Sequence, residues 1–581
     1  MNKILKTIKY FLFLLFIVTT LFAKITVIDI ISFNDFHGNV AEDTREKGKN
    51  IGMAKMVGYI NAARELNPNT IVVSGGDNYQ GTAISNLTFG APVSQMMKAM
   101  RLTVSAVGNH EFDWGSDRIE KWAEDGDFEY IAANIYDKTT DKPVAWAKPY
   151  KIVEVDGVKV GMIGLATEQT KFQTKAEFIQ NIEFKPVEEA AAYWVNFLKN
   201  GEAPEGKPDV IVAITHIPSD QNDDKTVLGE ELDRLTRVEG IDAIVTGHSH
   251  RTVAGTMNGK PVVQAYQYGR ALGTLHIVVE DGKILEITPT VNMVSNNKSD
   301  IIPDEEMVKI LAAQSEEMSD ILDEKLGVLS EDLTHSREGS LTELGYWATD
   351  VMRKYTNAQI GLTNGGGLRR TLYKGDITMG DLYEIMPFDN QVVVVKVTGA
   401  HLKQLIDHGI GADYMTDGQF AGLKVVYDPT KEYEHRIVSI SLENGMPIDD
   451  DEIYTVATND FIVGGGDRYD FKNAVETNDL FVPIRDVLVE DIKANNGITI
   501  PDISEVLISM EADAEAIQTL EESKSSVEEN RAPIVYIVKK GDNLSKIAEE
   551  NSTTVNNIIK INNFKNPNII QIGEQILIPA M

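Results

Sequence analysis

Five short segments of this sequence consist largely of residue types that bind metal ions. The chain has only ten histidines, and five of them lie in these segments. Carboxylate, imidazole and amide groups together suit zinc, manganese or a similar divalent ion. The pattern is the one that a two-metal hydrolytic centre requires. The segments are 34–38 (Asn-Asp-Phe-His-Gly), 75–77 (Gly-Gly-Asp), 108–113 (Gly-Asn-His-Glu-Phe-Asp), 215–216 (Thr-His) and 247–250 (Gly-His-Ser-His).

Each segment follows a run of apolar residues rich in β-branched side chains. Runs of this length and composition predict buried strands. Open α/β sheets place their active sites beyond the carboxyl ends of the strands, so the five segments are expected to meet there. The runs are 25–31, 71–73, 104–107, 210–214 and 241–245.

Two segments hold ligand-type residues two positions apart, Asp35 with His37 and His248 with His250. In extended backbone, residues i and i+2 point to the same face. We therefore expect each pair to converge on one ion. A single Asp or His in a loop is usually a cap or a solvated side chain, but five such segments in one chain indicate a common site.

The sequence divides into parts of different pattern. Strand-like runs alternate with helical stretches such as 52–65 and 187–199 in its first half, which predicts an α/β layered domain. Apolar residues at helical spacing within 304–326 predict a connecting helix, and its acidic start suits a helix N-terminus. A second α/β domain is expected to include a helix over 341–355 and a strand over 392–397. The predicted parts are a signal peptide (1–23), a first domain (24–300), a connecting helix (301–326), a second domain (327–510), an acidic linker (511–533) and a terminal module (534–581).

The first residues predict a secretory signal. Three lysines precede the apolar run from Phe11 to Val18, and Ala23 offers a small residue at a cleavage point. An uncleaved anchor is the alternative, but this run is shorter than the roughly 20 residues of a spanning helix. We expect an exported protein, periplasmic or associated with the cell wall, without membrane insertion after cleavage.

Charge and cysteine content exclude several classes of protein. Loss of three lysines and no acidic residue with the signal would change the formal charge from −33 to −36. So acidic a surface repels nucleic-acid polymers and anionic bilayers. The absence of cysteine excludes disulfides, thiolate zinc sites and a catalytic Cys.

In order and spacing, the five segments resemble those of the calcineurin-like metallophosphoesterases. The Asn-His-Glu-Phe-Asp string and the downstream domain resemble the 5′-nucleotidase family, over roughly residues 25–510. This resemblance implies a four-layer α/β/β/α metallophosphoesterase domain, a second α/β substrate-binding domain and two divalent ions (Zn, Mn or similar). One ion would be held by Asp35, His37, Asp77 and His250, and the other by Asp77, Asn109, His216 and His248.

Two details of the ligand set follow from the same resemblance. Many relatives have Gln or Asn in place of His250, which could alter the metal preference. His110 and Asp113 would form a catalytic dyad in which the carboxylate orients the imidazole against the transferring phosphoryl group. A role of His110 as a further metal ligand is the alternative.

The second domain contains two segments that resemble the nucleoside pocket of the family. In residues 364–369 (Asn-Gly-Gly-Gly-Leu-Arg), glycines permit close approach of backbone to a ligand, and arginine can fork onto phosphate. In residues 461–467, the family pattern stacks the aromatic residue on the base and uses the acid to hold the ribose hydroxyls. Tyr414 and Phe420 are both candidates for a second stacking aromatic. The predicted substrate-binding residues are Asn364, Gly366, Arg369, Phe420, Phe461 and Asp467.

Residues 536–579 resemble the LysM domain. The pattern indicates a strand, a turn at 540–542, two short helices and a strand after Gly573, which is a small βααβ module. Such modules bind N-acetylglucosamine chains of peptidoglycan, so the resemblance implies a tether to the cell wall. A small folded appendage without a ligand is the alternative.

The function expected from these observations is that of an exported, monomeric two-metal phosphohydrolase. It would remove the 5′-phosphate of nucleotides and would be held at peptidoglycan by LysM. A 2′,3′-cyclic-nucleotide phosphodiesterase and a nucleotide-sugar hydrolase on the same scaffold are alternatives. A thiosulfohydrolase should lack the 364–369 and 461–467 segments, and a wall-binding scaffold with a vestigial enzyme should have lost ligands.

Overall fold

The computed structural model describes residues 24–43, 50–336, 341–411, 417–510 and most of 534–578, there without 540–541, 552, 554, 563, 565–569 and 571–572. The predicted signal peptide, the acidic linker, Tyr414 and most of the predicted 540–542 turn lie outside the described residues. Within these ranges, no helix is both long and apolar enough to cross a membrane.

The first domain is built on two six-stranded sheets. In the first sheet, the neighbouring strands β1, β2 and β3 run parallel. In the second, β10 runs parallel to both β8 and β13. The first sheet has the order β17 (Lys283–Asn292), β16 (Leu272–Glu280), β1 (Ile25–Phe33), β2 (Thr70–Ser74), β3 (Val104–Ala106) and β4 (Glu129–Ile131). The second has the order β14 (Thr252–Met257), β15 (Lys260–Ala265), β13 (Ala243–Val245), β10 (Val210–His216), β8 (Val158–Ala166) and β7 (Tyr150–Val155).

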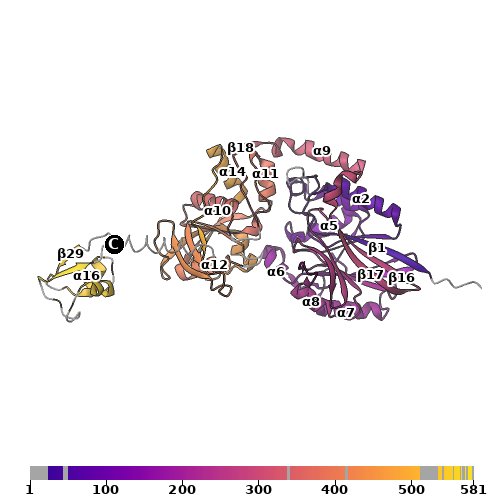
Figure 1. The fold of residues 1–581 in the computed structure, drawn as a ribbon, viewed down its shortest axis with the longest axis horizontal. Coiled ribbons are helices and arrows are strands. Elements are labelled where there is room, and N and C mark those ends of the chain that lie inside the picture. The colour runs from indigo at the N-terminus through magenta and orange to yellow at the C-terminus, as the bar shows by residue number, and fades with distance from the viewer. Residues whose placement is uncertain are drawn as a thin grey trace, which may run out of the picture. The chain divides into compact units, whose positions relative to one another are not determined.

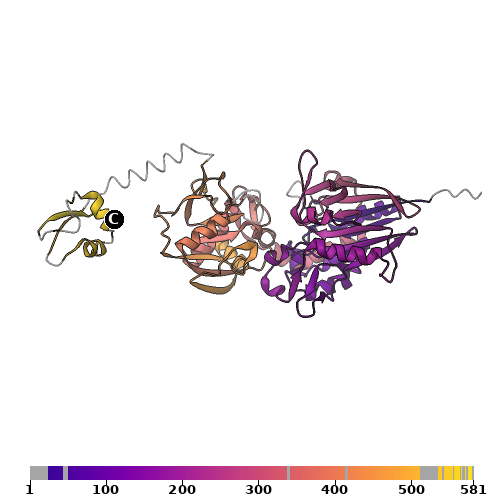
Figure 2. The ribbon, with the colours of Figure 1, turned by 90° about the horizontal axis from the view of Figure 1, so that it is seen from below.

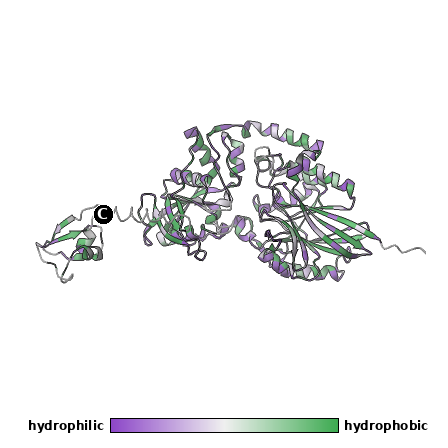
Figure 3. Cartoon of the chain, viewed as in Figure 1, coloured by the Kyte–Doolittle hydropathy of each residue, from purple (hydrophilic) through white to green (hydrophobic). Residues whose placement is uncertain are grey.

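The two sheets pack face to face, and helices cover their outer faces. Side chains such as Ile30 of β1 and Val212 of β10 share one core between the sheets, and Figure 3 shows how hydrophobic these strands are. Helices α2 (Gly52–Leu66), α4 (Ala91–Met100) and α5 (Asp117–Gly126) pack on the first sheet, and α7 (Val187–Lys199) and α8 (Glu230–Thr236) pack on the second. The sheets therefore lie between two helical layers (Figures 1 and 2). The predicted four-layer α/β/β/α architecture is confirmed.

Helix α9 (Glu305–Leu322) follows the first domain. The side chain of Asp304 caps it by accepting hydrogen bonds from the backbone N–H groups of Glu306 and Met307. The sequence predicted that this helix continues to residue 326, which is wrong. The helix ends at Leu322, and strand β18 (Lys325–Leu329) begins at Lys325, because residues 325–329 pair with β20 (Gly375–Thr378).

The second domain is also α/β. Its helix α10 (Glu343–Thr356) begins after the cap Thr342, close to the predicted 341–355, and packs into a core shared with α14 (Ile484–Asn495). Strand β21 covers the predicted 392–397. The central sheet has the order β22 (Gly418–Ala421), β19 (Ile360–Asn364), β25 (Ile453–Asn459), β21 (Gln391–Thr398) and β26 (Glu476–Pro483).

By their packing, the described residues within 424–440 and 504–578 form a compact unit distinct from the rest of the described chain. In this unit, β23 (Leu423–Tyr427) pairs in parallel with β28 (Leu507–Ser509). The predicted βααβ module is present: β29 (Ile534–Ile537) pairs antiparallel with β30 (Gln575–Ile578), and α16 (Leu544–Glu550) and α17 (Val555–Ile561) lie between them in sequence. Its small core includes Ile547, Ile558 and Ile576.

Candidate active site

The seven predicted metal ligands come together beyond the carboxyl ends of five strands. Asp35 and His37 follow β1, Asp77 follows β2, and Asn109 follows β3. His216 is the last residue of β10, while His248 and His250 follow β13. All except the half-buried His250 are at most 9% exposed, although every one of them is polar or ionisable. Buried polar groups need partners, and these side chains have mainly one another.

Five of these residues have a left-handed backbone, which non-glycine residues rarely adopt. The expectation that the Asp-x-His and His-x-His pairs converge through extended backbone is therefore wrong. They converge because the chain turns sharply after each strand. A strained backbone conformation of this kind costs about 1–3 kcal/mol per residue, and residues that adopt one cluster at functional sites. The φ angles are 50° at Asp35, 47° at His37, 56° at Asp77, 74° at His248 and 54° at His250.

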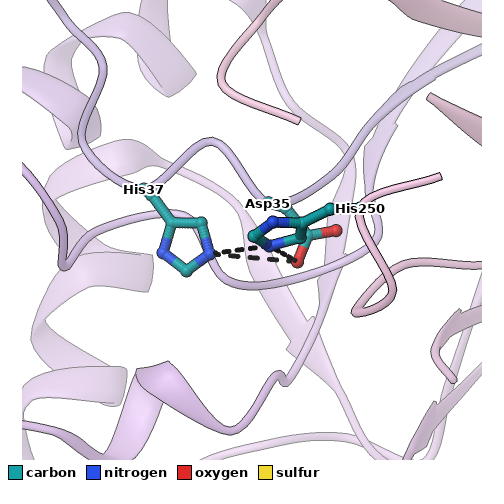
Figure 4. Close-up of side chains that lie close together, drawn as sticks. All are labelled: Asp35, His37 and His250. Atoms are coloured by element: carbon teal, nitrogen blue, oxygen red, sulfur yellow. Dashed lines mark hydrogen bonds and ion pairs between the residues drawn. The ribbon is translucent and has the colours of Figure 1, made fainter. Parts of the chain in front are cut away.

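The first group of candidate ligands comprises Asp35, His37 and His250 (Figure 4). Oδ1 of Asp35 lies 3.2 Å from Nε2 of His250 and 3.9 Å from Nε2 of His37. The two imidazole nitrogens are 3.3 Å apart. Oδ2 of Asp77 lies 3.8 Å from Nε2 of His37, so this carboxylate faces the same space.

The second group comprises Asp77, Asn109, His216 and His248. Nε2 of His216 lies 3.1 Å from Oδ2 of Asp77 and 3.2 Å from Oδ1 of Asn109. Nδ1 of His248 lies 3.0 Å from the same Asn109 oxygen. Since Oδ2 of Asp77 faces both groups, this carboxylate has the position of a shared ligand.

Hydrogen bonds fix the orientation of two of the imidazoles. Nδ1 of His37 is 2.9 Å from the carbonyl oxygen of Gln80, and Nδ1 of His216 is 2.7 Å from that of Gly75. Each Nδ1–H donates to its carbonyl, which directs Nε2 of the ring into the cluster. Partners of this kind are typical behind metal-binding histidines.

The charge states of the cluster also suit a cation. Burial raises the pKa of Asp35, but His250 and His216 outweigh it and the pKa falls to about 2. Burial holds the pKa of His37 well below its usual value, so its ring is neutral. Burial lowers the pKa of His216, yet Asp77 and Asp35 raise it to about 10, so an ion bound there would displace a proton. Carboxylates, imidazoles and an amide, without thiolate, fit divalent ions.

His110 and Asp113 form the predicted pair. Nδ1 of His110 lies 2.8 Å from Oδ2 of Asp113, and the His110 backbone N–H donates to Oδ1 of Asp77 at 2.9 Å. Burial lowers the pKa of His110, but the carboxylates of Asp113 and Asp77 outweigh it and the pKa is raised. A ring nitrogen of His110 also lies within 4.8 Å of ligand atoms of His37 and Asp77, which keeps open its alternative role as a ligand.

Glu111 has a role that the sequence did not reveal. Its carboxylate is fully buried and accepts hydrogen bonds from the backbone N–H groups of Asp77, Asn78 and Gly108, at 2.9, 2.8 and 2.6 Å. Burial raises its pKa to about 7. Glu111 therefore ties the loop that carries Asp77 to the loop that carries Asn109. The sequence feature that could have identified this role is the position of Glu111 between the ligand-type residues of segment 108–113.

One cavity of about 370 Å³ joins this cluster to the second domain. Asp77, Asn109 and His110 line it from the first domain. Five of the six predicted substrate residues line it from the second domain, namely Asn364, Gly366, Arg369, Phe461 and Asp467. A volume in this range suits a small-molecule substrate.

Phe420, the sixth predicted substrate residue, does not reach the cavity. It lies on β22 with 0% exposure, opposite Leu362 of β19, and belongs to the sheet core. The second-domain aromatic that lines the cavity beside Phe461 is Phe388. Its ring is 5.4 Å from that of His110, nearly parallel at 27°. An aromatic residue after Pro387, in the loop before β21, was the signal that could have identified it.

The polar residues of the second-domain wall hold one another in place. Nδ2 of Asn364 donates to Oδ2 of Asp467 at 2.6 Å, and Nε2–H of His408 donates to the backbone carbonyl of Asp467 at 2.8 Å. Arg369 brings Nη2 to 3.5 Å from Nε2 of His37, next to the candidate metal ligands. Its neighbour Arg370 turns away and pairs with Glu384 at 2.8 Å.

Three family models match the chain. Calcineurin-like phosphoesterase matches residues 28–252, the 5′-nucleotidase C-terminal domain matches 325–474, and the LysM domain matches 536–579. The crystal structure of a 5′-nucleotidase precursor from Thermus thermophilus superposes with a TM-score of 0.73 at 24% identity. It covers 83% of this chain and 99% of that chain, and it shows that the fold is shared.

Several curated proteins are similar in sequence. Endonuclease YhcR of Bacillus subtilis is 31% identical over 460 residues, which are 74% of this chain and 37% of that protein. Cell wall protein Lmo0130 of Listeria monocytogenes is 25% identical over 510 residues, 77% of this chain and 64% of that protein. The present chain thus spans less than two thirds of the length of these two relatives. The 5′-nucleotidase of Vibrio cholerae is 27% identical over 520 residues, 81% of this chain and 91% of that protein.

The two enzyme-domain matches lie in the order of the two domains described above, and the candidate ligands lie in the first of them. The chain belongs to the 5′-nucleotidase family, with a calcineurin-like phosphoesterase domain, a 5′-nucleotidase C-terminal domain and a LysM domain.

Proposed function

We propose that this chain hydrolyses the 5′-phosphate ester of nucleotides, giving nucleoside and phosphate, and that its LysM domain binds peptidoglycan. One observation carries the first part. A single cavity is lined by candidate metal ligands, by the His110–Asp113 pair and by an arginine, an acid and two aromatic residues of the second domain. These are the groups needed for a phosphate, a ribose and a base.

The residues present fit two divalent ions. Asp35, His37, Asp77 and His250 would hold one ion, and Asp77, Asn109, His216 and His248 would hold the other. Bound ions of this kind supply an activated water and neutralise phosphate oxygens. A donor set of carboxylates, imidazoles and an amide suits zinc, manganese or a similar divalent ion.

His110 and Arg369 serve the transferring phosphoryl group in this proposal. The raised pKa of His110 favours its protonated form, and Asp113 holds Nδ1–H so that Nε2–H is free to donate. It can stabilise charge on a phosphoryl oxygen or protonate the departing 5′ oxygen, which is the usual work of a positioned acid. The guanidinium of Arg369, close to His37, is placed to bind the phosphate.

The second domain would bind the nucleoside. Phe461 and Phe388 both line the cavity and offer ring faces to a base. Asp467, held by Asn364 and by His408, would accept hydrogen bonds from the ribose hydroxyls. In this proposal the second domain binds the nucleoside, and residues of both domains bind the phosphate.

The other parts of the chain support a location of the enzyme outside the cytoplasm. The LysM match and the similarity to a protein named as a cell wall protein support attachment to peptidoglycan. The predicted signal peptide supports export, and the acidic composition argues against nucleic-acid polymers as partners. We expect a monomer with access to extracellular or periplasmic nucleotides.

A phosphate-release screen tests the function. The full chain, loaded with Zn²⁺ or Mn²⁺, is assayed with AMP, GMP and CMP, with 2′,3′-cyclic AMP, with UDP-glucose and with p-nitrophenyl phosphate. The proposal requires the highest kcat/KM on a nucleoside 5′-monophosphate. A preference for the cyclic nucleotide or for the nucleotide sugar would replace it by one of the two alternative activities. Hydrolysis of p-nitrophenyl phosphate alone would leave the nucleoside pocket without a function.

A further inference from the structure

We propose that Phe89 and Trp114 of the first domain form a second ring-binding platform of the active-site cavity. Its ligand would be the second nucleoside of a substrate in which two nucleosides are joined through phosphate. This inference rests on the proposed function, because it assumes that the second domain binds the first nucleoside. It widens the substrate class from mononucleotides to phosphate-bridged dinucleosides.

Phe89 is an exposed aromatic residue on the wall of the cavity. It lies between α3 (Ala83–Leu87) and α4, lines the cavity, and is 45% exposed. Its φ angle is 50°, a left-handed conformation that is an outlier for so bulky a residue. Strained residues persist only where the surrounding structure holds them, and they cluster at ligand-binding sites.

Buried aromatic residues hold this strained backbone. The indole N–H of Trp122 donates to the carbonyl of Phe89 at 2.8 Å, and Trp122 stacks on the buried Tyr79 with ring centroids 4.0 Å apart. A Cβ atom at Gly90 would lie only 2.2 Å from Cδ1 of Tyr79, so only glycine fits there. The backbone of Phe89 is thus fixed against the core while its ring remains at the cavity.

Two neighbours complete the platform. The ring of Trp114, which also lines the cavity, meets that of Phe89 edge-on at 5.7 Å. The guanidinium of Arg118 lies 4.1 Å from the centroid of the Phe89 ring. Within the described part of the chain, the Arg118 side chain forms no ion pair and no hydrogen bond. Aromatic rings beside an arginine are the usual means of binding an unpaired base and its phosphate.

The catalytic pair lines the same cavity as both sets of rings. Asp113 directly precedes Trp114 in the sequence, and His110 stacks on Phe388 of the second domain. All of them line the same cavity. A phosphate at His110 therefore has Phe388 and Phe461 on the second-domain wall and Phe89 and Trp114 on the first-domain wall. A mononucleotide uses only one of these walls for its base.

The reaction expected of a 3′→5′ dinucleoside monophosphate is a hydrolysis. The oxygen of water forms a bond to phosphorus, and the bond from phosphorus to the 5′ oxygen of one nucleoside breaks. One proton of the water goes to that 5′ oxygen, and the other is released to solvent. The phosphate stays on the 3′ oxygen of the second nucleoside, the one held at Phe89. In a dinucleoside polyphosphate, a P–O–P bond breaks instead and two nucleotides result.

The experiment compares kcat/KM of the full, metal-loaded chain for three substrates: AMP, adenylyl-(3′→5′)-adenosine and diadenosine diphosphate. The two bridged substrates separate a diester from an anhydride. Phe89→Ala should lower the ratio of kcat/KM for a bridged substrate to that for AMP by about 5- to 150-fold, the loss expected for one base stack. Phe89→Trp should restore the ratio, since it keeps a ring at this position. Tyr193→Ala, at an aromatic residue 61% exposed on α7, is the matched control and should change nothing.

Two outcomes would overturn the platform. The wild-type chain could hydrolyse AMP but neither bridged substrate, or Phe89→Ala could leave the ratio of kcat/KM for a bridged substrate to that for AMP unchanged. An equal loss on all three substrates would make Phe89 a structural residue, and Phe89→Leu with a thermal melt would then show whether folding is impaired. Hydrolysis of a bridged substrate without hydrolysis of AMP would reject the proposed mononucleotide function and leave the platform standing.

Discussion

The buried carboxylate of Glu111 accepts a hydrogen bond from the backbone N–H of Asp77 at 2.9 Å. The same carboxylate binds the N–H groups of Asn78 and Gly108. Gly108 must be glycine, because a Cβ there would lie 2.1 Å from Oδ1 of Asp77. Glu111 thereby fixes the candidate bridging ligand relative to Asn109, although it lines neither group of ligands itself.

Glu111→Gln should impair metal binding without removing a ligand. An amide presents an NH₂ group to backbone N–H donors, so at least one of the three hydrogen bonds is lost. Loss of a partner behind the ligands typically costs about 10–100-fold in metal affinity or activity. Metal titration and kcat measure the effect, and Glu120→Gln, at an exposed site on α5, is the control. Wild-type affinity in Glu111→Gln would contradict this role.

Asp77→Asn should lose both ions. Oδ2 of Asp77 faces His37 of the first group and His216 of the second, so its charge serves both sites. Elemental analysis should find close to two divalent ions per wild-type chain and a deficit at both sites in the variant. A fully active wild-type preparation with one ion per chain would disprove the dinuclear proposal.

His110→Ala should reduce turnover severely while it preserves the metal content. A positioned acid or charge-stabilising group contributes about 10²–10⁴-fold to the rate. The His110 ring is not one of the proposed ligands, and its hydrogen-bond partner is Asp113. Removal of the ring should therefore leave both ion sites assembled. Parallel loss of metal and activity would instead assign His110 as a ligand.

Phe461→Ala and Phe420→Ala should behave differently. The first should weaken nucleotide binding by about 1–3 kcal/mol, the usual value of a base stack, and spare hydrolysis of p-nitrophenyl phosphate. The second removes a fully buried ring from the core and should lower the free energy of unfolding by about 3–5 kcal/mol. Nucleotide KM values and denaturant melts separate the two effects. Equal losses on both substrates in Phe461→Ala would place it in a structural role.

A truncation that ends at Met510 should keep phosphohydrolase activity and lose binding to the cell wall. All candidate ligands and all cavity-lining residues precede this position. Co-sedimentation with purified peptidoglycan compares the truncated chain with the full chain, and AMP hydrolysis in the supernatant is the control. Sedimentation of the truncated chain to the same extent as the full chain would show that the LysM domain is not the tether.

The sequence alone was sufficient to predict the layered fold and the set of candidate ligands. The segments that lead to Asp35, Asp77, Asn109 and His216 are rich in apolar, β-branched residues, and the structure places strands there. Strand pattern and residue type are local properties of the sequence. Because sites in α/β sheets lie beyond the carboxyl ends of the strands, these local properties also predict where the ligands meet. The bounds of α2 and α7 could be predicted for the same reason.

Only the tertiary structure decided which side chains face the cavity and how the ligands converge. Phe388 faces it while Phe420 is buried, and Asp35 and His37 reach their positions through left-handed backbone rather than an extended strand. The anchoring by Glu111 and the outward ring of Phe89 also became visible only in the fold. Each of these depends on contacts between segments distant in the chain, and the direction of a loop side chain is set by those contacts rather than by its neighbours in sequence.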